Sequence, residues 1–142
     1  MSDAQNLAYS AIQVVHNFGA VATVGGSIAT ILSPPDARRK LAWLVLGGWT
    51  TQAVSGPAFG MASYYFHGRF PDIAGIAITA LTIKIACVAI GFLLVAAWLC
   101  PCERYLPSCA NCLERYRNLV WPASTLLAAT ALTAAAFLRW FA

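Results

Sequence analysis

Charged residues are scarce in this chain, and acidic residues most of all. Only 10% of its 142 residues are charged, with 5 Asp or Glu against 9 Lys or Arg. Because 60% of the residues are hydrophobic and the mean hydropathy is +0.68, an ordinary soluble domain is excluded. The long apolar stretches contain no Asp or Glu, and this excludes a paired-carboxylate site within them. The sequence also shows no hydrolase triad and no nucleotide-binding loop.

Four apolar stretches are each long enough to cross a bilayer, whose hydrocarbon core needs about 20 helical residues. They run from Leu7 to Leu32, Leu41 to Phe66, Ile73 to Leu99 and Leu119 to Phe141. A continuous apolar run satisfies its backbone in lipid only as a helix. We therefore predict an all-α fold, a single domain over residues 1–142 that forms an integral-membrane up-down bundle of four transmembrane helices.

Basic residues gather in two of the connections between these stretches. The first, "SPPDARRK", holds Arg38, Arg39 and Lys40, and the third, "CPCERYLPSCANCLERYRN", holds three arginines. Because basic loops stay in the cytoplasm, we expect loops 1 and 3 inside and both termini in the periplasm of a bacterial inner membrane. The net charge of +4 then reflects topology, and no basic groove indicates a nucleic-acid partner.

Prolines and one glycine mark the expected helix ends. Pro34 and Pro35 are expected to end the first helix, since neither can donate to the helical hydrogen-bond ladder. Gly68 suits a left-handed cap of the second helix, and Pro122 suits the first turn of the fourth.

Two ionisable side chains lie deep inside the apolar stretches. Inserting a lysine at a helix centre costs about 2.5 to 3.5 kcal/mol, so such a residue is functional by default. Lys84 follows Ile73 by eleven residues and His16 follows Leu7 by nine. Both therefore lie roughly 14 to 16 Å along helices that run in the same direction. We expect them at similar depth, in the outer half of the bilayer.

Small residues share a helix face with these side chains. His16, Gly19, Thr23 and Gly26 form one stripe, since residues three, four and seven apart stack on one side of a helix. Such stripes mark a surface where another helix or a flat cofactor approaches closely, so His16 is expected to point inward. Similar faces combine Gly56, Gly60, Ser63 and His67 in the second helix, and Ala77, Lys84 and Gly91 in the third.

The chemistry of these side chains permits more than one interpretation. A neutral imidazole ligates haem iron or copper, and a buried lysine acts as a base or a ligand. The simpler alternatives are a His16 hydrogen bond to a carbonyl, a Lys84 that extends to the headgroups, and a His67 that caps its helix. For His67 we favour the simpler role, and Met61 is a further soft ligand or a packing residue. For His16 and Lys84 together we favour a functional site.

The histidine of the first helix with paired glycines nine and ten positions later, and the lysine in the third helix, resemble a known pattern. These residues are His16, Gly25, Gly26 and Lys84, and the resemblance is to the copper-resistance D (CopD) family and the related HemJ-type membrane proteins. The HemJ-type likeness implies haem b binding at the histidine and lysine, with protoporphyrinogen oxidation. The CopD likeness implies copper handling.

Four cysteines occupy the third connection, residues 100–118. Cys100, Cys102, Cys109 and Cys112 form a CxC and a CxxC pair within "CPCERYLPSCANC", and four thiolates can hold zinc or an iron–sulfur centre. In the cytoplasm a metal is favoured, whereas an inverted orientation favours two disulfides. We favour a structural metal that joins the third and fourth helices, with an electron relay or a docking loop as alternatives. Cys87 is expected to pack as a small apolar residue.

Three functions remain. The first is a haem b-binding or redox-associated membrane protein with its site around His16 and Lys84, where His67 and Met61 are further candidate ligands. The second is a copper-handling protein of CopD type. The third is a non-catalytic accessory subunit of a respiratory or photosynthetic complex. The expected partners are membrane lipid and other membrane subunits or a redox protein, and we do not expect a stand-alone enzyme.

Overall fold

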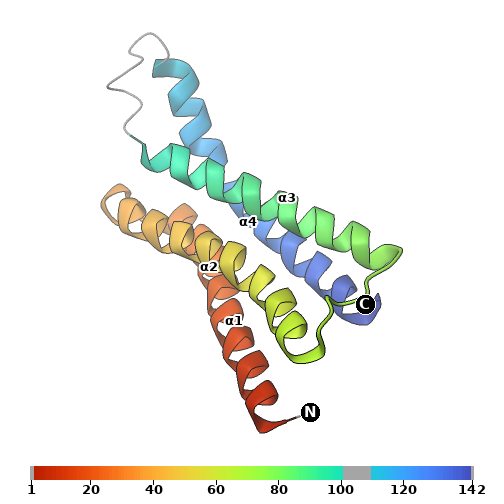
Figure 1. Ribbon diagram of the computed structural model, residues 1–142. Coiled ribbons are helices and arrows are strands. Elements are labelled where there is room, and N and C mark those ends of the chain that lie inside the picture. The colour runs from red at the N-terminus through yellow and green to blue at the C-terminus, as the bar shows by residue number, and fades with distance from the viewer. Residues whose placement is uncertain (1, 101–109, 142) are drawn as a thin grey trace.

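The computed structural model describes residues 2–100 and 110–141, and these form four helices without a strand. The helices are α1 (Asp3–Leu32), α2 (Pro35–His67), α3 (Ile76–Leu99) and α4 (Ala110–Phe141). Figure 1 shows them as two hairpins, α1 beside α2 and α3 beside α4, with alternating chain direction. The predicted all-α up-down bundle is confirmed.

The first connection is much shorter than predicted. Helix α1 ends at Leu32 and α2 begins at Pro35, so that only Ser33 and Pro34 link them. The basic residues expected in this loop therefore lie on the first turns of α2. Proline is favourable at the first helical position because its missing N–H has no partner there, and Asp36 suits the positive end of the helix dipole.

The fourth helix begins at Ala110 instead of Leu119, so residues 110–118 of the predicted connection are helical. The prediction that Pro122 lies in the first turn is wrong, since the proline lies inside α4. Hydropathy marks where the apolar part of a helix begins, and α4 begins before that point. The predicted cap of the second helix is confirmed, because Gly68 has φ 69° and donates its N–H to the Tyr64 carbonyl at 2.9 Å.

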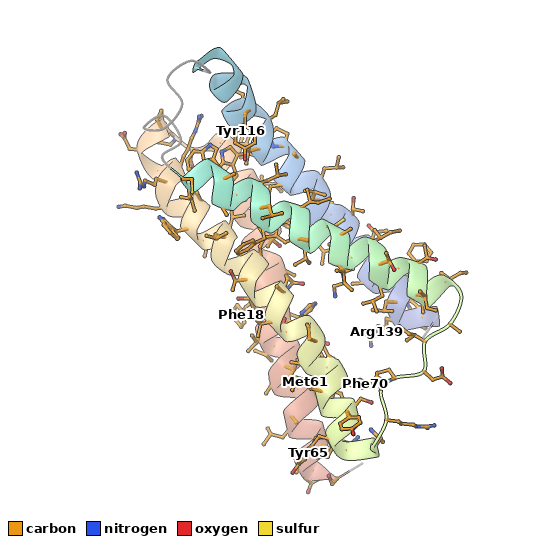
Figure 2. All side chains as sticks on the ribbon, turned by 45° about the horizontal axis from the view of Figure 1, so that its top comes forward. Phe18, Met61, Tyr65, Phe70, Tyr116 and Arg139 are labelled. Atoms are coloured by element: carbon orange, nitrogen blue, oxygen red, sulfur yellow. The ribbon has the colours of Figure 1, made fainter. Side chains whose placement is uncertain are left out.

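Three helices are long and apolar enough to span a membrane: α1, α3 and residues 118–140 of α4. They mark the chain as a membrane protein. Helix α2, with 33 residues, is also long enough, but it does not reach the same apolarity. Its middle carries polar side chains, namely Thr50, Thr51, Gln52 and Ser55. Large apolar side chains such as Phe18 point away from the bundle (Figure 2), as expected of surfaces that face lipid.

The core lies where the hairpins pack on each other, around Trp49 of α2. The Trp49 side chain is 1% exposed, and a Cβ added to Gly91 of α3 would lie 2.5 Å from the indole ring. Trp49 Nε1 donates to Ser124 Oγ at 3.3 Å, and Ser124 Oγ lies 2.9 Å from Ser27 Oγ. The indole therefore contacts both helices of the second hairpin. The other buried members of this cluster are Ala42, Val45, Val95, Val120, Trp121 and Ala128.

The two hairpins diverge away from this core. In Figures 1 and 2 they lie close together near the start of α2 and the end of α3, and they separate toward the end that carries both termini. His16 of α1 and Lys84 of α3 contact each other across the two hairpins.

Candidate functional site

Close packing of α1 on α2 sets the position of His16. A Cβ added to Gly48 would lie 2.9 Å from the backbone nitrogen of Thr23, and one added to Gly19 would lie 2.9 Å from the Gln52 amide nitrogen. The stripe that His16 shares with these small residues is thus covered by a helix. Of the two predicted occupants of this surface, a helix or a flat cofactor, the structure has the helix.

His16 is buried, at 8% exposure, and each ring nitrogen has one protein partner. Nδ1 lies 2.7 Å from Ser55 Oγ, and the Ser55 hydroxyl donates its single hydrogen to the Thr51 carbonyl at 2.5 Å. Ser55 Oγ must therefore accept from His16, so Nδ1 carries a hydrogen. In the neutral ring this leaves the lone pair on Nε2.

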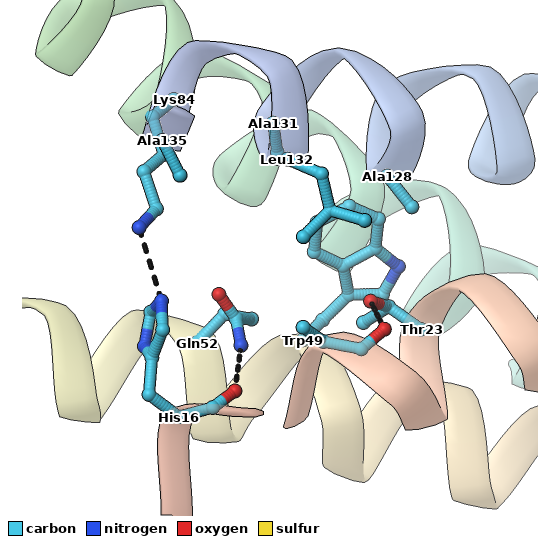
Figure 3. A pocket seen from close by; sticks show the side chains of 10 residues that line it. His16, Thr23, Trp49, Gln52, Lys84, Ala128, Ala131, Leu132 and Ala135 are labelled. Atoms are coloured by element: carbon cyan, nitrogen blue, oxygen red, sulfur yellow. Dashed lines mark hydrogen bonds between the residues drawn. The ribbon is translucent and has the colours of Figure 1, made fainter. Parts of the chain in front are cut away.

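That lone pair faces the other hairpin. Lys84 Nζ of α3 lies 3.0 Å from His16 Nε2, and Figure 3 shows the lysine side chain extending toward the imidazole. A hydrogen bond between two nitrogens needs a hydrogen on one of them and a lone pair on the other. The contact therefore accommodates at most one excess proton, either on Nζ or on Nε2.

Two further side chains hold the imidazole in place. Gln52 Nε2 donates to the His16 backbone carbonyl at 2.6 Å, and the Phe59 ring meets the imidazole edge to face with centroids 5.8 Å apart. Gln52 and Ser55 are absent from the predicted site. Their spacing puts both on one face of α2, and a polar face in a long helix of a membrane protein is the pattern that could have indicated them.

A small cavity adjoins the pair. Its volume is about 20 Å³. The first three helices line it with His16, Ala20, Thr23, Trp49, Gln52 and Lys84, and α4 lines it with Leu132 and three alanines (Figure 3). Pockets for cofactor-sized ligands are about 300 to 1,000 Å³, so a porphyrin does not fit beside His16 in this arrangement. Moreover, the ring nitrogen with the lone pair that a metal would need, Nε2, is hydrogen-bonded to Lys84.

The other predicted ligands of this site lie elsewhere. His67 Nε2, at the end of α2, lies 3.1 Å from Gln5 Nε2 near the start of α1. Since the amide nitrogen must donate, this histidine joins the ends of the first hairpin. Met61 is 69% exposed, and Figure 2 shows it on the outside of α2, toward Tyr65. The structure thus brings together His16 and Lys84 but not His67 or Met61.

The predicted cysteine site falls largely outside the described residues. Cys100 is exposed and unbridged, whereas Cys102 and Cys109 lie in the gap at 101–109 and only the backbone of Cys112, in α4, is described. Within the described part of the chain no group of three or more His, Cys, Asp or Glu side chains could hold a metal ion. The zinc or iron–sulfur site stays a prediction. Cys87 is buried in α3, as expected.

Comparison of the chain with protein families, with curated proteins and with solved structures gave no match.

Proposed function

We propose that this chain is a membrane protein that holds a proton inside the bilayer and transfers it there, with Lys84 and His16 as the groups that share it. The observation that carries the proposal is the 3.0 Å contact between Lys84 Nζ and His16 Nε2. Moving one proton from Nζ to Nε2 breaks one N–H bond and forms another, and leaves the two heavy atoms in place.

The surroundings of the pair support this role. Ionisable groups within a membrane are costly and typically serve proton or ion pathways. The apolar stretches contain no acidic residue, so within them no carboxylate neutralises a charge on the pair. A purely structural lysine would be stabilised by such a partner, whereas a lysine that must gain and release a proton needs none.

Proton flux into proteoliposomes tests the proposal. Purified protein is reconstituted with a pH-sensitive dye inside, and a potassium gradient with valinomycin sets the membrane potential. We expect flux above that of protein-free liposomes, and about a hundredfold less in Lys84→Met and in His16→Phe. Lys40→Met, which removes an exposed lysine from the first turns of α2, is the control and should keep the flux. Flux equal to that of empty liposomes, or unchanged in Lys84→Met, overturns the proposal.

We further propose the orientation that the basic residues favour, with both termini in the periplasm of a bacterial inner membrane. Arg38, Arg39 and Lys40 lie at the start of α2, at the end of the bundle away from both termini (Figure 1). An impermeant thiol reagent tests this. Labelling of Cys109 from the periplasmic side of intact cells contradicts the orientation.

The functions implied by the family resemblance stay predictions. An absorption spectrum of the purified protein, oxidised and dithionite-reduced, distinguishes them from proton transfer alone. A b-type band that His16→Ala removes supports the haem-linked function, and a colourless protein with stoichiometric copper supports the copper-handling one. A protein with neither is expected from proton transfer or from an accessory subunit that packs its exposed apolar faces against other subunits.

A further inference from the structure

The cavity beside the pair offers hydrogen-bond donors on one side. A lysine ammonium has three N–H groups, and one of them serves His16 Nε2. No other hydrogen bond from Lys84 Nζ is present within residues 2–100 and 110–141. Since Lys84 lines the cavity, its remaining hydrogens are available to a molecule inside it.

The same cavity offers an acceptor on the other side. Gln52 gives its amide nitrogen to the His16 carbonyl at 2.6 Å, so its amide oxygen faces away from that carbonyl. In Figure 3 this oxygen lies on the side of the amide toward α4. Thr23 Oγ1 donates to the Ala20 carbonyl at 2.9 Å and lies beside Trp49, away from Lys84 (Figure 3). Both residues line the cavity.

We propose that one water molecule binds in this cavity, accepting from Lys84 Nζ and donating to Gln52 Oε1, and that it is the donor from which a proton reaches the pair. This inference adds the proton donor to the proposed function and rests on that function. A buried water makes two to four hydrogen bonds, and Lys84 and Gln52 provide two of them.

Size and chemistry both select water over an ion. A cavity of about 20 Å³ exceeds the roughly 10 to 15 Å³ that one water needs. An anion would face the Gln52 carbonyl oxygen, and a metal cation would face the N–H groups of Lys84 Nζ. Only a small molecule that both donates and accepts satisfies the two sides.

Lys84 receives a proton from this water when its side chain is the neutral amine. When the pair holds no excess proton, Lys84 Nζ is an amine with a lone pair. A hydronium in the cavity then gives its proton to Nζ, so that one O–H bond breaks, one N–H bond forms and a neutral water remains. The protein supplies the place for this exchange between α4 and the first hairpin.

Filling the cavity tests the inference without altering the pair. Ala131 lines the cavity from α4 and is buried, whereas Ala129 of the same helix is exposed. In the liposome assay Ala131→Leu, and Ala131→Val as a smaller replacement, should lower proton flux about tenfold or more, and Ala129→Leu should not. Flux in a folded Ala131→Leu protein equal to that of the unaltered protein overturns the inference.

Nuclear magnetic resonance of the protein in bilayers gives an independent readout. Magnetisation transferred from water should reach the Gln52 side-chain amide in the unaltered protein and in Ala129→Leu, and should be lost in Ala131→Leu. Absence of the transfer in the unaltered protein overturns the water site. A protein that shows the transfer but no proton flux retains the water site and loses the proposed function, so the two failures are distinguishable.

Discussion

Lys84 Nζ and His16 Nε2 meet at 3.0 Å across the two helical hairpins, although 68 positions separate the residues in the sequence. The first hairpin fixes the imidazole, and the second supplies the lysine. Because Ser55 accepts from Nδ1, it leaves the lone pair of the neutral ring on Nε2, and the position of the shared proton is set by three helices together.

Ser55→Ala should release the imidazole from its single tautomer. The variant removes the oxygen that accepts from Nδ1 at 2.7 Å, and an unsatisfied buried donor costs about 1 to 3 kcal/mol. Nitrogen-15 chemical shifts of His16 should then show hydrogen on both ring nitrogens in exchange. Thr50→Val is the matched control, since Thr50 is exposed and donates only to the Leu46 carbonyl. A variant whose His16 shifts match those of the unaltered protein would show that Ser55 does not select the tautomer.

Gly91→Ala should destabilise the contact between the hairpins. Its methyl group would lie 2.5 Å from the Trp49 ring, and overpacking of this kind costs about 1 to 3 kcal/mol. Unfolding in mixed micelles of increasing SDS content measures the free energy. Gly47→Ala is the control, because nothing lies within 4 Å of its Cβ position. Equal stability of the two variants is inconsistent with the packing described for Trp49.

Ser27 and Ser124 should be energetically coupled. Their hydroxyl oxygens lie 2.9 Å apart, and both residues are fully buried. A double-mutant cycle with Ser27→Ala and Ser124→Ala should give a coupling free energy of about 0.6 kcal/mol, the average for interhelical hydrogen bonds in membranes. Strict additivity of the two single changes would mean that this hydrogen bond adds nothing to the association of α1 with α4.

The four cysteines of the third connection should bind a metal if that connection is cytoplasmic. Elemental analysis of protein purified under reducing conditions should find zinc or iron near one equivalent or as a small cluster, and Cys102→Ser should remove it. Cys87→Ser is the control, since this buried cysteine lies within α3. Cysteine-intact protein without zinc or iron contradicts the prediction.

Counting residues along the helices predicted that His16 and Lys84 lie at the same level, because helix rise is constant and the two helices run in the same direction. Their 3.0 Å contact agrees with this. Their partners were harder to predict. Whether Gln52 and Ser55 face α1, lipid or another subunit depends on how α2 is rotated, and periodicity alone does not determine this rotation. For the same reason, the sequence did not decide whether a helix or a flat cofactor covers the stripe of His16. In the structure α2 packs on Gly19 and covers it.

Helix ends were predicted less well than helix interiors. Pro35 fits the end of one helix and the start of the next equally well, and the structure has it at the start of α2. Ala110 begins α4 within a polar segment, where hydropathy marks the membrane boundary and not the helix boundary. The small cavity depends on side chains from all four helices, and no local pattern predicts it.

The most direct test of proton sharing is nitrogen-15 magnetic resonance of His16 and Lys84 in lipid bilayers, recorded over a range of pH. We expect hydrogen on Nδ1 of His16 at every pH, and one excess proton at most between Nε2 and Lys84 Nζ while the two nitrogens remain hydrogen-bonded. A ring with hydrogen on Nε2 alone, or an imidazolium that stays bonded to a lysine ammonium, would contradict it.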